Sequence, residues 1–161
     1  MKVFFDASVL VAGSEQSHPQ YAQARPALQR VVGAKDRGFI SVHSIAEVDA
    51  VLTRLPVHPR IHPAEAGQMV TDNIVPHFAT VAIGKKDYIE ALRLAGSGGW
   101  SGAKIYDALL LGCAARREVN WIYSFNLRDF RQLVSSLEAK ICTVIAGRSF
   151  SGIRGRLLYR L

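Results

Sequence analysis

Short apolar runs alternate with longer amphipathic segments along the chain. The runs, which are typical of buried strands, lie at residues 2–5, 39–42, 79–83, 121–123 and 141–145. Segments with helical spacing lie between most of them and predict helices at 20–32, 44–55, 63–74, 85–95 and 105–117. Pro26 predicts a break or kink in the first helix. The alternation indicates an α/β fold with a five-stranded, mainly parallel sheet flanked by helices.

Glycines and prolines mark the predicted connections. The glycine-rich stretch 96–99 and Gly102 predict a flexible loop before the helix at 105, and Pro56, Pro59 and Pro63 predict a turn region. No internal repeat or low-complexity tract is visible. A length of 161 residues, 49% of them hydrophobic, is typical of a single domain that buries a sizeable core, so we expect one domain over 1–161.

Cysteine usage and hydropathy suggest a cytoplasmic protein. Cys113 and Cys142 lie in apolar stretches without metal-ligand or CxxC spacing, so we expect small core residues in a reduced compartment. The apolar run before Asp6 is too short for a secretory signal. The longest apolar run, 108–115, is far below the roughly 20 residues that span a bilayer, which predicts a buried helix and no membrane segment.

The charge balance favours a polyanionic partner without identifying one. The formal net charge is +7. After Glu138 no acidic residue follows, and we expect a basic C-terminal extension at about 147–161. This tail lies along phosphates, docks on a partner, or is simply solvated, and the pattern leaves all three open. The basic residues after Glu138 are Lys140, which precedes the extension, and Arg148, Arg154, Arg156 and Arg160 within it.

Asp6 is the first candidate for chemistry. It directly follows a predicted buried strand, at the point where the chain turns into a helix. In open α/β sheets ligands bind beyond the carboxyl ends of the strands, so such a carboxylate is well placed for a site. The structural alternative is a helix N-cap.

Two further acids follow predicted strands or open predicted helices. Glu47 stands three residues after Ser44, a spacing that also forms a capping box, and for Glu47 by itself capping is the commoner role. Asp107 lies in the first turn of the helix at 105–117, where the helix dipole also favours a negative charge. Apolar Ile105, Leu109 and Cys113 surround it at helical spacing, so we expect Asp107 to be partly sheltered.

The segment after the fourth predicted strand supplies the remaining candidates. Ser124, Asn126 and Asp129 all leave the same strand end. Asp129 has its own structural alternative, which is to cap the helix that carries Phe130. Each acid therefore has an ordinary explanation, and only the set of four indicates a site.

Four motifs in order resemble those of PIN-domain nucleases, and more closely the VapC toxins of bacterial and archaeal toxin–antitoxin pairs. They are FDASVL at 5–10, AEVDAVLTRLP at 46–56, IYDAL at 105–109 and YSFNLRDF at 123–130. The resemblance covers nearly the whole chain. It implies a three-layer sandwich, a Mg²⁺ or Mn²⁺ ion at an acidic pocket and endonucleolytic cleavage of RNA.

Carried over to this chain, the resemblance assigns roles residue by residue. Asp6, Glu47 and Asp107 match the three principal acidic positions, and Ser8 matches a small hydroxyl residue that helps to arrange the site. This sequence departs from the pattern where many relatives have Asp in place of Asn126 and Thr in place of Ser124. Asp129 is then the candidate for the fourth carboxylate. The implied partners are RNA, a VapB-like antitoxin and a second copy of the chain.

Phosphodiester cleavage explains why such a set of acids needs a metal. A divalent ion activates water and neutralises phosphate oxygens, and hard cations take oxygen ligands. Two carboxylates about 4 Å apart repel by roughly 4 kcal/mol at an effective dielectric near 20, so the cluster requires a counter-charge. Lys104, Arg128 and Arg131 are the nearest basic residues, as phosphate contacts or as a solvated face.

Other residues and motifs bear on alternative roles for the chain. Tyr106 and Phe125 are candidates for base stacking, although packing in the core is the commoner role. The histidines form no HExxH motif, and no Walker or GxGxxG loop is present. The rival functions are a catalytically weak PIN-like module that binds RNA or a partner, which Asn126 favours, and a housekeeping RNA-processing nuclease.

Overall fold

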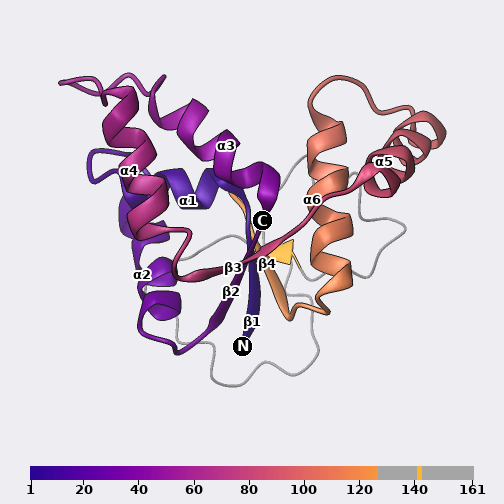
Figure 1. Ribbon diagram of the computed structural model, residues 1–161, viewed down its shortest axis with the longest axis horizontal. Coiled ribbons are helices and arrows are strands. Elements are labelled where there is room, and N and C mark those ends of the chain that lie inside the picture. Colours follow the sequence, from indigo (N-terminus) through magenta and orange to yellow (C-terminus); the bar gives the residue numbers. More distant parts are fainter. Residues whose placement is uncertain (127–140, 143–161) are drawn as a thin grey trace, which may run out of the picture.

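The computed structural model describes residues 1–126 and 141–142. Helices and strands alternate along the chain, as the apolar pattern predicts (Figure 1). Their bounds are β1 Lys2–Phe5, α1 Ala7–Ser14, α2 Tyr21–Val32, β2 Arg37–Ser41, α3 Val42–Leu52, α4 Pro63–Asn73, β3 Phe78–Val81, α5 Lys85–Gly98, α6 Lys104–Arg116, β4 Trp121–Tyr123 and β5 Ile141–Cys142.

The five strands form one sheet in the order β3-β2-β1-β4-β5, and every pairing is parallel. The expectation of a five-stranded parallel sheet is confirmed. β1 lies in the middle, between β2 and β4, and its residues Val3, Phe4 and Phe5 are fully buried. A strand covered on both faces reads as a continuous apolar run, which is the pattern that predicted β1.

Side chains of β1 alternate between two apolar cores, one on each face of the sheet. Val3 and Phe5 join the core formed with helices α1 to α4, whereas Phe4 points to the opposite face and packs with residues of α6. Figure 1 shows α1 to α4 on one side of the sheet and α6 on the other, with α5 outside α6. The predicted three-layer sandwich is therefore confirmed.

Two local predictions are wrong, the first of them in part. Of the break or kink predicted at Pro26, the break is wrong, because the helix continues from Tyr21 to Val32 with Pro26 inside. The predicted loop at 96–99 is mostly helix: α5 continues to Gly98, and Gly99 ends it with a φ of 64°. That left-handed conformation suits glycine, and the amide of Trp100 donates to the carbonyl of Ala95 to close the last turn.

No helix among the residues that the structure describes is long and apolar enough to cross a membrane. Cys113 is a free cysteine and is buried, and its burial raises the pKa of the thiol. Several sequence-based candidates lie outside the described residues. They are Arg128, Asp129, Arg131, Lys140 and the C-terminal extension at 147–161.

Candidate active site

Asp6 leaves β1 and is 7% exposed. It occupies the N-cap position of α1, but its side chain makes no capping hydrogen bond. Instead its Oδ2 accepts hydrogen bonds from the hydroxyls of Ser8, at 2.5 Å, and Ser124, at 2.7 Å. The capping alternative therefore fails for the side chain, which is held by two hydroxyl donors at the edge of the sheet where the strands end, called here the carboxyl edge.

The same two hydroxyls bind the loop that follows β4. The amide of Phe125 donates to Ser8 Oγ at 3.2 Å, and the amide of Asn126 donates to Ser124 Oγ at 2.9 Å. Ser124 is fully buried. This arrangement follows from the sheet, because β1 and β4 are neighbours and Phe5 pairs with Tyr123. The structure therefore brings Asp6, Ser8 and Ser124 together at the ends of two neighbouring strands.

Glu47 lies on α3, well inside the helix. The N-cap is Ser41, whose Oγ accepts from the backbone amide of Ser44 at 3.0 Å, so the cap lies three residues before the predicted one. The capping-box alternative for Glu47 is therefore wrong. Burial raises the pKa of Glu47, and the negative charge of Asp6 raises it further. Glu47 and Asp6 thus share one electrostatic environment.

Asp107 stands in the first turn of α6 and is half-buried, which confirms the predicted partial shelter. Since α6 leads back to the start of β4, its first turn lies towards the carboxyl edge. No three His, Cys, Asp or Glu side chains among residues 1–126 are close enough to hold a metal ion. The structure therefore brings Asp6 and Glu47 into electrostatic contact and leaves Asp107 on the facing helix.

Of the two aromatic residues expected to pack in the core, only one does so. Phe125 does pack against the core. Tyr106, however, is 48% exposed, and its ring stacks on His43 of α3. The hydrophobic pattern does not predict this pair. The one available signal is that His43 stands four residues before Glu47, and Tyr106 one residue before Asp107, so each aromatic ring accompanies an acid.

The chemistry of the two carboxylates fits a divalent cation. Both serine hydroxyls bind the same oxygen of Asp6, and Oδ1 accepts no hydrogen bond within residues 1–126. No salt bridge within residues 1–126 involves Asp6 or Glu47. An oxygen with free lone pairs beside a second, partly desolvated carboxylate is a suitable ligand set for Mg²⁺ or Mn²⁺.

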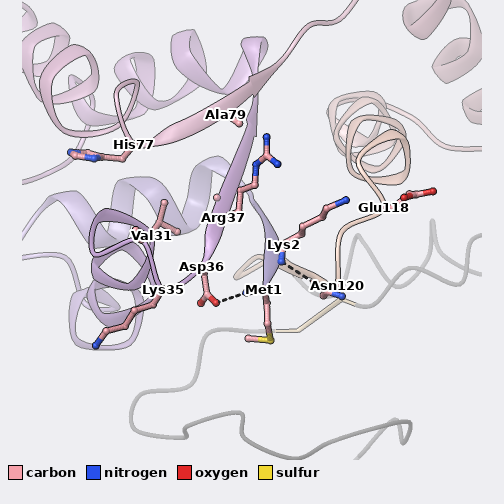
Figure 2. A pocket seen from close by; sticks show the side chains of 12 residues that line it. Met1, Lys2, Val31, Lys35, Asp36, Arg37, His77, Ala79, Glu118 and Asn120 are labelled. Carbon is pink, nitrogen blue, oxygen red and sulfur yellow. Dashed lines mark hydrogen bonds and ion pairs between the residues drawn. The ribbon is translucent and has the colours of Figure 1, made fainter.

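Hollows in the described part of the chain lie elsewhere or are small. One of about 800 Å³ lies at the opposite end of the strands, where Met1, Lys2 and Asp36 begin or precede them (Figure 2). It contains no candidate site residue. A smaller groove of about 280 Å³ is bordered by Glu47 on α3 and by Arg54 just after the end of that helix. Of these two hollows, the smaller groove is the one that a candidate site residue borders.

Fold and site together define an α/β protein with an acidic site at the carboxyl edge of a parallel sheet. The chain belongs to the PIN domain family, whose sequence model matches residues 3–134. No curated protein sequence matches the chain.

Solved structures of similar fold include three toxin–antitoxin proteins. VapC20 of Mycobacterium tuberculosis, titled a sarcin–ricin loop cleaving toxin, is 15% identical with a TM-score of 0.60, over 77% of this chain and 89% of that one. VapBC2 of Rickettsia felis, bound to a promoter DNA fragment, is 13% identical with a TM-score of 0.60, over 89% and 98%. FitAcB of Neisseria gonorrhoeae is 12% identical with a TM-score of 0.60, over 86% and 95%.

Proposed function

We propose that the chain is a metal-dependent endoribonuclease and the toxin of a VapBC-type toxin–antitoxin pair. The observation that carries this proposal is Asp6, fixed by Ser8 and Ser124 through one oxygen, with Glu47 close enough for the charge of Asp6 to raise its pKa. Membership of the PIN domain family supports it.

Asp6 and Glu47 would hold a Mg²⁺ or Mn²⁺ ion, directly or through water, and Asp107 would complete the acidic set. When bound, such an ion activates water and neutralises phosphate oxygens. The two serine hydroxyls keep the carboxylate of Asp6 in one orientation, so its free oxygen does not have to reorganise when the ion arrives. Lys104, in the same helical turn as Asp107, would contact the RNA backbone, as would Arg128 and Arg131.

The fourth acidic position stays a sequence-based proposal. Asn126 is half-buried, and its amide is tied to Ser124. We propose that Asp129 supplies the carboxylate. If so, Asp129→Asn lowers the rate of cleavage, whereas Asn126→Asp leaves the rate unchanged or raises it. An unchanged rate in Asp129→Asn together with a lowered rate in Asn126→Asp would assign the position to residue 126.

The decisive experiment is cleavage of cellular RNA by the purified protein with Mg²⁺, Mn²⁺ or EDTA, followed by sequencing of the cut ends. We expect defined cuts with the metals, none with EDTA, and none with Asp6→Asn. Asp49→Asn is the matched control, since Asp49 lies on the same helix as Glu47 and its side chain forms no hydrogen bond with Asp6. Asp6→Asn protein that cuts as fast as the wild type would refute the assignment.

The same experiment separates the rival functions. Metal-independent binding of RNA or of a protein partner without any cut would identify a catalytically weak module. If the RNA is cut and the small protein encoded by the neighbouring reading frame does not inhibit cleavage, the result would favour a housekeeping nuclease.

The proposed partners are a VapB-like antitoxin and a second copy of the chain. The VapBC2 and FitAB structures, both with DNA fragments, support an antitoxin partner by analogy of fold. Co-purification with the product of a neighbouring reading frame, and the mass of the purified chain by light scattering, test the two partners separately.

A further inference from the structure

His43 and Tyr106 form an aromatic stack between helices of opposite layers. Their ring centroids are 5.0 Å apart, and the ring planes are inclined by only 8°. His43 stands in the first turn of α3, directly after β2 ends, and Tyr106 in the first turn of α6. Since α3 and α6 cover opposite faces of the sheet (Figure 1), the stack lies over the carboxyl edge.

The stack is a surface feature, not a part of either core. Tyr106 is 48% exposed, although a ring of this size gains most when it is buried. Neither ring belongs to the apolar clusters of the described residues. One face of Tyr106 lies on His43, and a large part of the ring remains open to solvent.

The position of the stack relative to the acids gives it a use. His43 stands one helical turn before Glu47 on α3, and Tyr106 directly precedes Asp107 on α6. A polymer whose phosphate lies at the acids would therefore place a neighbouring flat group within reach of the stack. In RNA that group is a nucleobase, and every base has a π-face that stacks on an aromatic ring.

We propose that Tyr106 is a stacking platform for a nucleobase of single-stranded RNA, and that His43 positions it. The inference rests on the proposed ribonuclease function and names its substrate class. Bases in a duplex already stack on one another, so the platform selects unpaired RNA. His43 supports the ring from one side and fixes its plane, so that less conformational entropy is lost when a base binds to the other side.

The test measures binding without cleavage. The full chain carrying Asp6→Asn is titrated in EDTA into a short oligouridine RNA with one 2-aminopurine, and anisotropy and 2-aminopurine fluorescence are followed. We expect binding with quenched fluorescence for this parent protein. Tyr106→Leu should weaken binding about tenfold or more and abolish the quenching, and Tyr106→Phe should restore both.

Tyr88 offers a matched control. It is a 41% exposed tyrosine on α5, away from the stack, and Tyr88→Leu should change the affinity by less than about twofold. His43→Ala should weaken binding less than Tyr106→Leu does. Because stacking is not electrostatic, the slope of affinity against salt should be the same for Tyr106→Leu as for the parent.

The outcomes separate this inference from the proposed function. Unchanged affinity for RNA in Tyr106→Leu overturns the proposed platform. This is also the result expected if the stack binds a protein partner instead of RNA. Unquenched fluorescence in the parent overturns it even if the leucine variant fails to fold, and so does equal affinity for single- and double-stranded RNA. No RNA binding by the parent overturns both, whereas quenched binding by wild type without cleavage in Mg²⁺ overturns only the nuclease.

Discussion

Ser124 connects the carboxylate of Asp6 to the loop after β4, and its hydroxyl is fully buried. We predict that Ser124→Ala lowers stability by about 1–3 kcal/mol, because a buried amide and a carboxylate each lose a partner. Cleavage should fall by about 10- to 100-fold, as is typical when a group that orients a metal ligand is removed. Urea denaturation and single-turnover cleavage measure the two effects.

Ser44→Ala is the control for this prediction. Ser44 is equally buried and bonds the hydroxyl of Ser41 at 2.8 Å, but it does not contact Asp6. It should cost stability without a comparable loss of cleavage. If both variants lost cleavage in proportion to stability, the role of Ser124 would be purely structural.

Glu47 carries a cost that depends on pH. Its pKa in the folded chain is raised above the ordinary value of 4.5, first by burial and then by the charge of Asp6. At pH values well below the ordinary pKa of 4.5, Glu47 is protonated in both the folded and the unfolded chain, and it does not lower the free energy of unfolding. As pH rises towards the folded pKa, the unfolded chain loses its proton first, so the free energy of unfolding falls, and above the folded pKa the loss is complete.

We therefore predict that Glu47→Gln is more stable than wild type at neutral pH without metal, and that this difference disappears in acid. Mg²⁺ should raise the melting temperature of wild type more than that of the variant, since the ion compensates the carboxylate. Glu65→Gln should not be more stable than wild type at neutral pH, since Glu65 lies in the exposed first turn of α4, where the helix dipole favours a negative charge. A variant less stable than wild type at every pH would contradict the electrostatic argument.

The sequence pattern placed Asp6 and Ser124 at the ends of two predicted strands, and these side chains meet because the two strands are parallel neighbours that end at the same edge. It misplaced the helix cap beside Glu47, since Ser41 and Ser44 are the same residue type and only the backbone decides between them. It also missed the exposure of Tyr106. Spacing cannot show this, because the first turn of a helix projects past the sheet that buries the later turns.

At the scale of elements, α5 shows how packing overrides local composition. A Cβ at Gly98 would lie 2.4 Å from Cε2 of Trp100, whose ring packs against the cores around α6. We predict that Gly98→Ala destabilises the chain by about 1–3 kcal/mol through this overlap. Gly96→Ala on the same helix meets nothing within 4 Å and should stabilise by up to about 1 kcal/mol. Thermal denaturation of the pair checks both signs, and equal effects would exclude the contact with Trp100.

Elements were predicted correctly where the evidence was a run of buried apolar residues. They were predicted wrongly where the evidence was the presence of glycine or proline. β1 and β4 were predicted with the bounds observed, because each is an apolar run between polar turns. The glycines of α5 predicted a loop, yet the close approach of Trp100 needs a residue without a side chain at Gly98. Pro26 predicted a break in α2, but the flanking Ala24, Ala27 and Leu28 are buried and hold the helix together.

For the whole molecule, the formal charge of +7 and the acidic edge act at different distances. The net charge attracts RNA from afar, whereas the carboxylates repel phosphates at close range until a cation intervenes. The affinity for RNA should therefore fall steeply as the salt concentration rises. Ca²⁺ or Mg²⁺ should raise the affinity of the wild type, and should raise that of the inactive variant Asp6→Asn by less.

Lys104 provides the sharpest test of this division. It opens α6 in the same turn as Asp107, so Lys104→Gln should weaken RNA binding uniformly across sequences and reduce the slope of log affinity against log salt by about 0.7. Lys86→Gln, on exposed α5, should leave the slope unchanged. Fluorescence anisotropy over a range of salt concentrations measures both. An unchanged slope in Lys104→Gln would mean that the phosphates follow another path over the molecule, and the backbone contacts would then have to come from other basic residues.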